Sequence, residues 1–224
     1  MADIDFKRDC WYAGSCVGLA GYPEYPRCKT ICPRYKEMSH LINTCGMPDA
    51  ERYLKTLSPS PKDKDAYARL QEIKQNIVPF VERGYSLFIS SPNIQSGKTS
   101  WALKILYKYF DEIWSNNGFR TRGYFIHVPK FLLNLKNFDY NKTDEFKAID
   151  RVLQNANLVV WDDITSLKMS DYERGMVETY LSTRAMKGFA NIYTGPQVRD
   201  IAEIVGTVIT NRISRSETVV LLGN

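Results

Sequence analysis

The chain has 224 residues, of which 44% are hydrophobic and 25% charged, with a formal net charge of +5 at pH 7. These values are ordinary for a globular protein and exclude a disordered or collagen-like chain. No apolar run approaches the roughly 18 residues that a membrane helix needs, and the first residues contain no apolar signal segment. We therefore expect a cytoplasmic protein. At roughly 150 residues per domain, the length fits one domain plus a smaller one.

Four of the five cysteines lie within the first 32 residues: Cys10, Cys16, Cys28 and Cys32. Four thiolates suit tetrahedral zinc, which would stabilise a segment with too little aliphatic content for a core of its own. Their spacing is not the usual paired arrangement with two intervening residues, and His40 is an alternative ligand because three cysteines and one histidine also bind zinc. The fifth cysteine, Cys45, is expected to be a free thiol.

The first part of the chain divides by composition. Residues 33–55 have a helical pattern with a break at Gly46–Pro48, and residues 56–65 are rich in Pro, Ser and charge, as is typical of a linker. We therefore predict a cysteine-rich domain over residues 1–55, a linker over 56–65 and a second domain over 66–224.

From residue 66 onward, helical and strand patterns alternate. Apolar residues repeat at spacings of three and four from Leu70, which predicts a helix that Pro79 bends and Gly84 ends. Ser170 and Glu173 form a capping-box pattern at the start of another helix. The other predicted helices cover 99–114, 129–137, 144–154 and 197–214, and the predicted strands cover 85–90, 123–128, 157–161, 191–194 and 217–222. Strands separated by helices predict an α/β fold, with a parallel sheet covered by helices on both faces.

The segment SPNIQSGKTS, residues 91–100, follows a predicted strand and opens a predicted helix. Its Gly97, Lys98 and Thr99 match the end of the phosphate-binding loop pattern, although Pro92 replaces the first glycine. In such loops backbone N–H groups at a helix N-terminus bind phosphate, the lysine reaches the β and γ phosphates, and the threonine hydroxyl binds Mg²⁺. The predicted ATP-binding residues are Pro92, Asn93, Gln95, Ser96, Gly97, Lys98, Thr99 and Ser100.

The segment NLVVWDD, residues 157–163, supplies a second motif. A magnesium–nucleotide site needs an acidic residue at the end of a neighbouring hydrophobic strand. We expect Asp162 to hold Mg²⁺ with Thr99, directly or through water, and Asp163 to orient and deprotonate the attacking water. Alone, the segment would indicate a solvated acidic turn; together with the phosphate loop it favours nucleotide hydrolysis.

At this point the chain resembles the DnaC/DnaI-type AAA+ replicative helicase loaders, in particular those of phages of Gram-positive bacteria. The resemblance rests on SPNIQSGKTSWALKILYKYF, NGFRTRGYFIHVPKFLLNLKNF, NLVVWDDITSLKMSDYE and NIYTG, and more loosely on the cysteine-rich segment followed by CPRYKEM. It implies a P-loop AAA+ ATPase domain and a small N-terminal zinc-binding helical domain that grips the helicase, in a bacterial host cell.

The resemblance also implies roles for single residues. Thr194 of NIYTG matches the threonine that senses the γ-phosphate in family members, and Gln197 is an alternative. Gly206 and Arg212 match the pattern that carries the arginine finger, which would neutralise charge on the γ-phosphate bound by a neighbouring subunit. Arg215 is nearby and is an alternative to Arg212.

Three departures from the family pattern predict slow hydrolysis. Val208 stands where some loaders have another arginine, Asp163 stands where many AAA+ proteins have glutamate, and little chain follows Arg212 to carry a later sensor arginine.

A stretch of lysines and aromatic residues is a candidate surface for single-stranded DNA, because lysines can follow the phosphates while aromatic rings stack on bases. Its members are Lys130, Phe131, Lys136, Phe138, Tyr140, Lys142, Phe146 and Lys147. The alternative interpretation is that Phe131, Leu132 and Leu135 are packing residues and the lysines form a solvated face.

The sequence thus predicts an ATP-dependent loader that binds the hexameric replicative helicase, helps place it on single-stranded DNA and self-associates through its ATPase domains. Three alternatives stay open. A nucleotide-binding helicase adaptor or inhibitor that does not hydrolyse ATP is favoured by Pro92 and Asp163. A transposition-helper ATPase is disfavoured by the cysteine-rich segment. A small-molecule kinase would need an arginine-rich lid, which we do not find.

Overall fold

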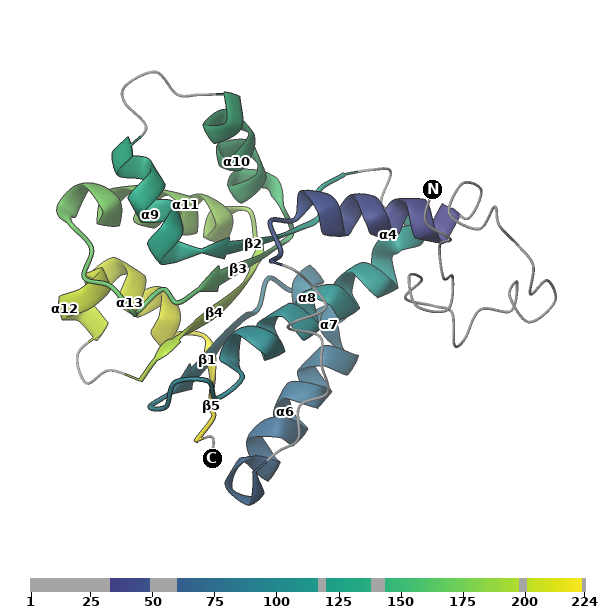
Figure 1. Ribbon diagram of the computed structural model, residues 1–224, viewed down its shortest axis with the longest axis horizontal. Helices are drawn as coiled ribbons and strands as arrows, with labels where there is room; N and C mark the ends of the chain where they lie inside the picture. Colours follow the sequence, from purple (N-terminus) through teal and green to yellow (C-terminus); the bar gives the residue numbers. More distant parts are fainter. Residues whose placement is uncertain (1–32, 49–59, 117–119, 138–143, 198–200, 223–224) are drawn as a thin grey trace, which may run out of the picture.

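A five-stranded parallel sheet forms the centre of the molecule (Figure 1). The computed structural model describes residues 33–48, 60–116, 120–137, 144–197 and 201–222. The strands are β1 (Ser86–Ser91), β2 (Gly123–His127), β3 (Leu158–Asp162), β4 (Ala190–Pro196) and β5 (Glu217–Val220). Their spatial order is β2-β3-β4-β1-β5, which inserts β4 between the strand before the phosphate loop and the strand that ends in the acidic pair. The predicted parallel sheet is confirmed.

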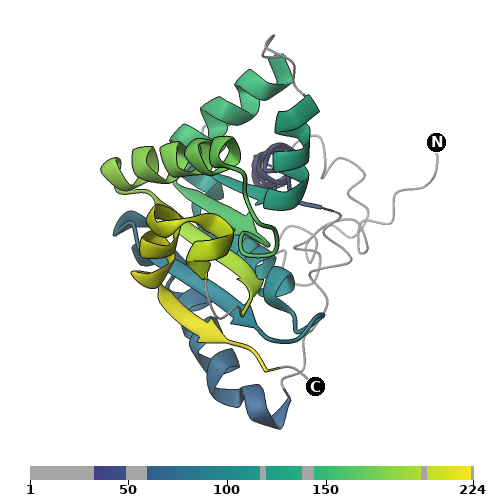
Figure 2. The ribbon, with the colours of Figure 1, turned by 90° about the vertical axis from the view of Figure 1, so that its left-hand side faces the viewer.

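Helices cover both faces of the sheet (Figures 1 and 2). One face carries α4 (Pro33–Thr44), α6 (Lys64–Gln75), α7 (Ile77–Glu82) and α8 (Lys98–Ile113). The other carries α9 (Val128–Asn137), α10 (Asp144–Asn155), α11 (Asp171–Met186), α12 (Ile201–Val205) and α13 (Thr207–Ser214). Short 3-10 turns cover Pro61–Asp63 (η1) and Trp114–Asn116 (η2).

Successive strand residues enter the two cores alternately, because side chains alternate across a strand. In β1, Leu87 and Ile89 join the core under α8, whereas Phe88 joins the core on the opposite face. A strand that is buried on both faces has no polar side to alternate, which explains the continuous apolar runs in the sequence. Among the described residues, no helix is long and apolar enough to cross a membrane.

The helix predicted up to Gly84 is divided at Asn76, not bent at Pro79. The backbone N–H and the side-chain Nδ2 of Asn76 both donate to the carbonyl oxygen of Glu72, at 3.0 Å each, and α6 ends there. Pro79 then falls in the first turn of α7, where a proline is tolerated because N–H groups of that turn have no intrahelical acceptor.

The single helix predicted over 197–214 is also wrong, because Gly206 separates α12 from α13. Gly206 has φ 86° and ψ 163°, a conformation that is essentially restricted to glycine. A Cβ atom there would lie 2.3 Å from Cδ of Arg174. By contrast, the predicted capping box of α11 is present: Ser170 and Glu173 each bond to the other's backbone N–H.

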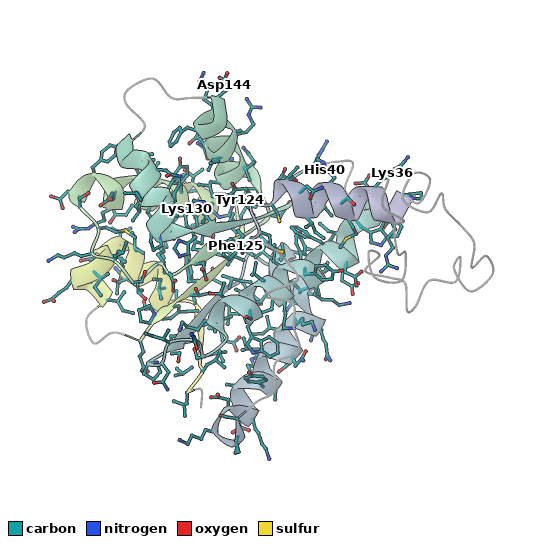
Figure 3. The ribbon with its side chains drawn as sticks, viewed as in Figure 1. Lys36, His40, Tyr124, Phe125, Lys130 and Asp144 are labelled. Carbon is teal, nitrogen blue, oxygen red and sulfur yellow. The ribbon has the colours of Figure 1, made fainter. Side chains whose placement is uncertain are left out.

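Helix α4 packs on the second domain, although it belongs to the segment predicted as the first. Met38, Leu41 and Cys45 are fully buried in the core that also contains α8. Arg34 Nη2 lies 2.7 Å from Asp111 Oδ1 of α8. After the helix, the Cys45 carbonyl accepts a 2.6 Å hydrogen bond from the N–H of Phe125 in the edge strand β2, beside which α4 lies in Figure 3.

The end of the predicted linker is likewise folded against the same body. Asp63 is buried and its carboxylate accepts hydrogen bonds from Ser60 Oγ (3.1 Å) and from the N–H of Leu222 (2.7 Å), which follows β5. Residues 1–32, with Cys10, Cys16, Cys28 and Cys32, and residues 49–59 lie outside the described residues. The zinc site and the domain division therefore stay predictions.

Candidate nucleotide and magnesium site

The phosphate loop joins β1 to α8 at the edge of the sheet where the parallel strands end. Gly97, the N-cap of α8, has φ 90°, and Gln95 has φ 61°. These two positive angles turn the chain so that the free N–H groups of the first helical turn face the loop. Pro92, Asn93 and Gln95 are exposed, so the loop is open to solvent.

Lys98 curls back over the loop. Its Nζ donates to the carbonyl oxygen of Asn93 (3.1 Å) and to Ser96 Oγ (3.3 Å). Burial lowers the pKa of Lys98, and the charges of Asp163 and Asp162 oppose that shift. The ammonium group is thus held by oxygen acceptors of the loop to which a phosphate would bind.

The structure brings together the two predicted magnesium ligands. Asp162 at the end of β3 is 2% exposed, and its Oδ1 accepts from Thr99 Oγ1 of α8 (2.8 Å) and from Thr194 Oγ1 of β4 (2.7 Å). Burial raises the pKa of Asp162, and the hydrogen bonds from Thr194 and Thr99 oppose the shift. A hydroxyl and a carboxylate oxygen are ligands that Mg²⁺ uses in nucleotide sites.

Thr194 lies beneath the acidic pair. Its hydroxyl donates to Asp162 and accepts from the N–H of Asp163 (3.0 Å), and the residue is fully buried. One hydroxyl has one proton to give, so Thr194 has no proton left for a phosphate in this arrangement. Its geometry is that of a support for the Asp162 carboxylate and the Asp163 main chain. Gln197, the alternative, is exposed beside the loop and donates its N–H to the Ser91 carbonyl (2.9 Å).

Asp163 is held in the left-handed region, with φ 57°. Its Oδ2 lies 3.6 Å from Nε2 of His127, the last residue of β2. His127 is not among the predicted site residues, because the order of the strands along the chain does not show that β2 is the direct neighbour of β3. The available signal was its position as the final polar residue of an otherwise apolar predicted strand.

Arg212 does not join this group. Together with Arg215 it lines a cavity of about 250 Å³ that is also bounded by Ser86 and Asn191, near the starts of β1 and β4. The phosphate loop follows the other end of β1, five residue steps from Ser86, which is about 17 Å at roughly 3.3 Å per residue. Arg212 therefore lies at the end of β1 opposite to the candidate nucleotide site of its own chain.

Only some residues of the candidate DNA-binding stretch are exposed and could contact DNA. Phe131 and Phe146 are buried in the core between the sheet and α9 to α11, which confirms the packing interpretation for Phe131, Leu132 and Leu135 and removes both rings from base stacking. Lys130 is exposed on α9, and Lys147 Nζ lies 3.1 Å from Asp144 Oδ1. The side chain of Lys136 and residues Phe138, Tyr140 and Lys142 are outside the described part.

No protein-family model and no curated protein sequence matches the chain. Among solved structures it is similar to a DnaC helicase loader, with 22% identity and a TM-score of 0.60 over 76% of this chain and 99% of that chain. It is also similar to DnaI, with 15% identity and a TM-score of 0.59 over 79% of this chain and 95% of that chain. AMPPCP-bound DnaA from Aquifex aeolicus matches at 14% identity and a TM-score of 0.56, over 75% of this chain and 49% of that one.

These likenesses define a shared fold. The parallel sheet with its helices has the same fold as the matched parts of the DnaC and DnaA structures. The chain spans nearly the whole of the DnaC loader and about half the length of the DnaA chain.

Proposed function

We propose that the protein is an ATP-dependent helicase loader that acts in the initiation of DNA replication. Nucleotide binding is supported by one observation above all, the 2.8 Å hydrogen bond from Thr99 Oγ1 to Asp162 Oδ1. It joins the residue after the loop lysine to the end of β3, 63 residues away in sequence. A chance strand end would not place its carboxylate on the hydroxyl that follows the loop lysine.

In the proposed mechanism the triphosphate enters at the N-terminus of α8, where free N–H groups and the helix dipole favour an anion. Lys98 exchanges its contacts with Asn93 and Ser96 for the β and γ phosphates, so its charge is already at the point of use. When bound, Mg²⁺ supplies charge neutralisation at the phosphate oxygens, and Thr99 and Asp162 are the residues that would hold it.

Asp163 is the proposed acceptor of the water proton. The hydrogen bond from its N–H to Thr194 Oγ1 fixes its main chain, and this restricts the positions that its carboxylate can take beside Asp162. Arg212 lies at the end of β1 opposite to this site; the proposal therefore assigns it to the nucleotide of a neighbouring copy, which requires self-association.

The helicase-loading part rests on the fold. The similarity to the DnaC and DnaI structures covers 95% or more of those chains. The DnaC protein is described as a helicase loader. We infer a hexameric replicative helicase and single-stranded DNA as partners.

The cysteine-rich segment before α4 is the proposed element that binds the helicase, and one zinc ion is proposed to stabilise it. Metal analysis of the purified protein should find about one zinc per chain, and the Cys28→Ser variant should lose this zinc.

The deciding experiment mixes the purified protein with the replicative helicase of its host and measures loading on single-stranded DNA. We expect a complex by size-exclusion chromatography, loading with ATP, and loss of loading in Lys98→Ala. If no complex forms, the loader proposal fails. If Lys98→Ala loses ATP binding but keeps full loading, the protein is an adaptor that works without hydrolysis.

A further inference from the structure

The chain that follows β5 passes between the phosphate loop and the start of α6. The last pair in the register of β1 with β5 is Ser90 with Val220, and the N–H of Leu221 then donates to the Ser90 carbonyl oxygen (2.8 Å). In Figure 1 the chain runs from β5 towards the first turn of α6. Leu222 lies beyond the strand pairing, so its backbone groups take their partners from outside the sheet.

Those partners come from two distant parts of the chain. The N–H of Leu222 donates to Asp63 Oδ1 (2.7 Å), 159 residues away in sequence. Its carbonyl oxygen accepts a hydrogen bond from Nδ2 of Asn93 in the phosphate loop. Asp63 is 2% exposed, and its other carboxylate oxygen accepts from Ser60 Oγ (3.1 Å). The main chain of Leu222 therefore joins a buried carboxylate to the phosphate loop.

Asn93 is also the residue that holds the loop lysine. Its carbonyl oxygen accepts from Lys98 Nζ (3.1 Å). In the proposed mechanism Lys98 leaves this contact for the phosphates, and the loop then loses it. The bond from Asn93 to Leu222 uses the side-chain amide and does not involve Lys98. It can therefore hold the loop in place while the lysine binds the nucleotide.

We propose that Asp63 is a positioning residue for the phosphate loop: it fixes the main chain of Leu222, and Leu222 fixes the side chain of Asn93. The inference rests on the proposed nucleotide site and extends it, because the affinity for ATP then depends on the segments before α6 and after β5. A loop that is ordered before the ligand arrives loses less conformational entropy on binding, and the affinity is higher for that reason.

The binding test measures the dissociation constant of the magnesium complex of AMPPCP by isothermal titration calorimetry. Asp63→Ala should raise it about fivefold, the equivalent of one net hydrogen bond. Asp63→Asn keeps an oxygen that accepts from the N–H of Leu222, so it should bind AMPPCP nearly as the wild type does. An Asp63→Ala variant with wild-type affinity, or an Asp63→Asn variant as weak as Asp63→Ala, would overturn the proposal.

Ser60→Ala is the matched control for a general loss of packing around the carboxylate. It removes the hydrogen bond to Asp63 Oδ2 and leaves the one between Asp63 Oδ1 and Leu222. It should therefore bind AMPPCP like the wild type, and circular dichroism would check that all variants are folded. If Ser60→Ala weakened binding as much as Asp63→Ala, the effect would belong to the packing of this segment and the role of Asp63 would be refuted.

A double-mutant cycle tests whether Asp63 acts through the loop. Asn93→Ala removes the amide that binds Leu222, and Asn93 is exposed, so the variant should fold. Asp63→Ala should then weaken AMPPCP binding in the wild-type background and have little further effect in the Asn93→Ala background. Losses of the same size in both backgrounds would show that the two residues act independently, which contradicts the proposed connection.

Amide hydrogen exchange at Leu222 tests the connection without a nucleotide. The N–H of Leu222 should exchange slowly in the wild type and in Asp63→Asn, and faster in Asp63→Ala. Equal exchange in all three would show that the bond does not form. A wild type that protects this amide but binds no AMPPCP would refute the nucleotide site of the proposed function, whereas binding that is insensitive to Asp63 would refute only the role of Asp63.

Discussion

The backbone of Asp163 has a conformation that few residues adopt. Asp163 occupies the left-handed region, with φ 57°. In that region a residue other than glycine is less stable by about 1–2 kcal/mol, because its Cβ atom crowds the following carbonyl oxygen. Such strain concentrates at functional sites, and aspartate tolerates it better than most residues. The conformation also gives a physical reason for an aspartate at this position, since aspartate is among the residues enriched at positive φ.

We expect Asp163→Gly to be more stable than Asp163→Ala by about 1 kcal/mol. Both changes remove the carboxylate, and only glycine accepts the positive φ without strain. Urea unfolding of the two variants measures the difference, and equal stabilities would show that the angle is not strained. Neither variant should hydrolyse ATP at an appreciable rate.

The stability of the protein should depend on pH through Cys45. Burial raises the pKa of this thiol from 9.0 to about 12. The unfolded chain then releases the proton at a lower pH than the folded chain, so the stability contributed is complete below pH 9 and is lost as the pH rises towards 12. The slope is about 1.4 kcal/mol per pH unit in that interval.

The measurement compares unfolding free energies of the wild type and Cys45→Ala between pH 8 and pH 10.5 under reducing conditions. The variant removes the titrating group, so the advantage of the wild type should shrink as the pH rises. An advantage that stays constant would show that the thiol ionises alike in both states.

At the level of elements, α10, α11 and β4 are joined by one buried guanidinium. Arg184 of α11 is fully buried and donates to the carbonyl oxygens of Leu153 (3.0 Å), Ala156 (2.7 Å) and Ala190 (2.6 Å), and to Asn191 Oδ1 (2.7 Å). The positive group thus binds carbonyls at the C-terminal end of α10, where the helix dipole favours a cation. Burial lowers the pKa of Arg184 to about 9.

The junction between α12 and α13 depends on one glycine. Gly206→Ala should lower the free energy of unfolding by about 2 kcal/mol, because alanine does not adopt φ 86° with ψ 163° and its Cβ would meet Arg174. Gly175→Ala is the matched control: it lies within α11 with nothing within 4 Å of the added Cβ, and should gain about 0.5–1 kcal/mol. Thermal unfolding of both variants tests the pair, and a neutral Gly206→Ala would contradict the strain.

For the whole molecule, the separation of Arg212 from the phosphate loop predicts complementation between two inactive variants. Lys98→Ala lacks a working loop and Arg212→Ala lacks the arginine, so each alone should hydrolyse little ATP. In an equal mixture about a quarter of head-to-tail contacts join an intact loop to an intact arginine. The mixture should therefore recover about a quarter of the wild-type rate, measured with single-stranded DNA and helicase present.

Two results would contradict this prediction. A mixture as inactive as its components would exclude action between copies, and an Arg212→Ala variant as active as the wild type would exclude the arginine from hydrolysis. Arg215, which lines the same cavity, provides the comparison variant Arg215→Ala.

Local patterns in the sequence determined most of the elements. The strand runs, the capping box at Ser170 and the phosphate loop ending in Gly97-Lys98-Thr99 are short-range features, because periodicity and backbone chemistry act within a few residues. They sufficed for the parallel sheet and for the pairing of Thr99 with Asp162. Only the tertiary structure decided the strand order, and with it the placement of His127 beside the acidic pair and of Thr194 beneath it. It also docked α4 on the helical layer that contains α8 and turned Phe131 and Phe146 inward, because contacts between residues distant in sequence depend on which faces are buried together.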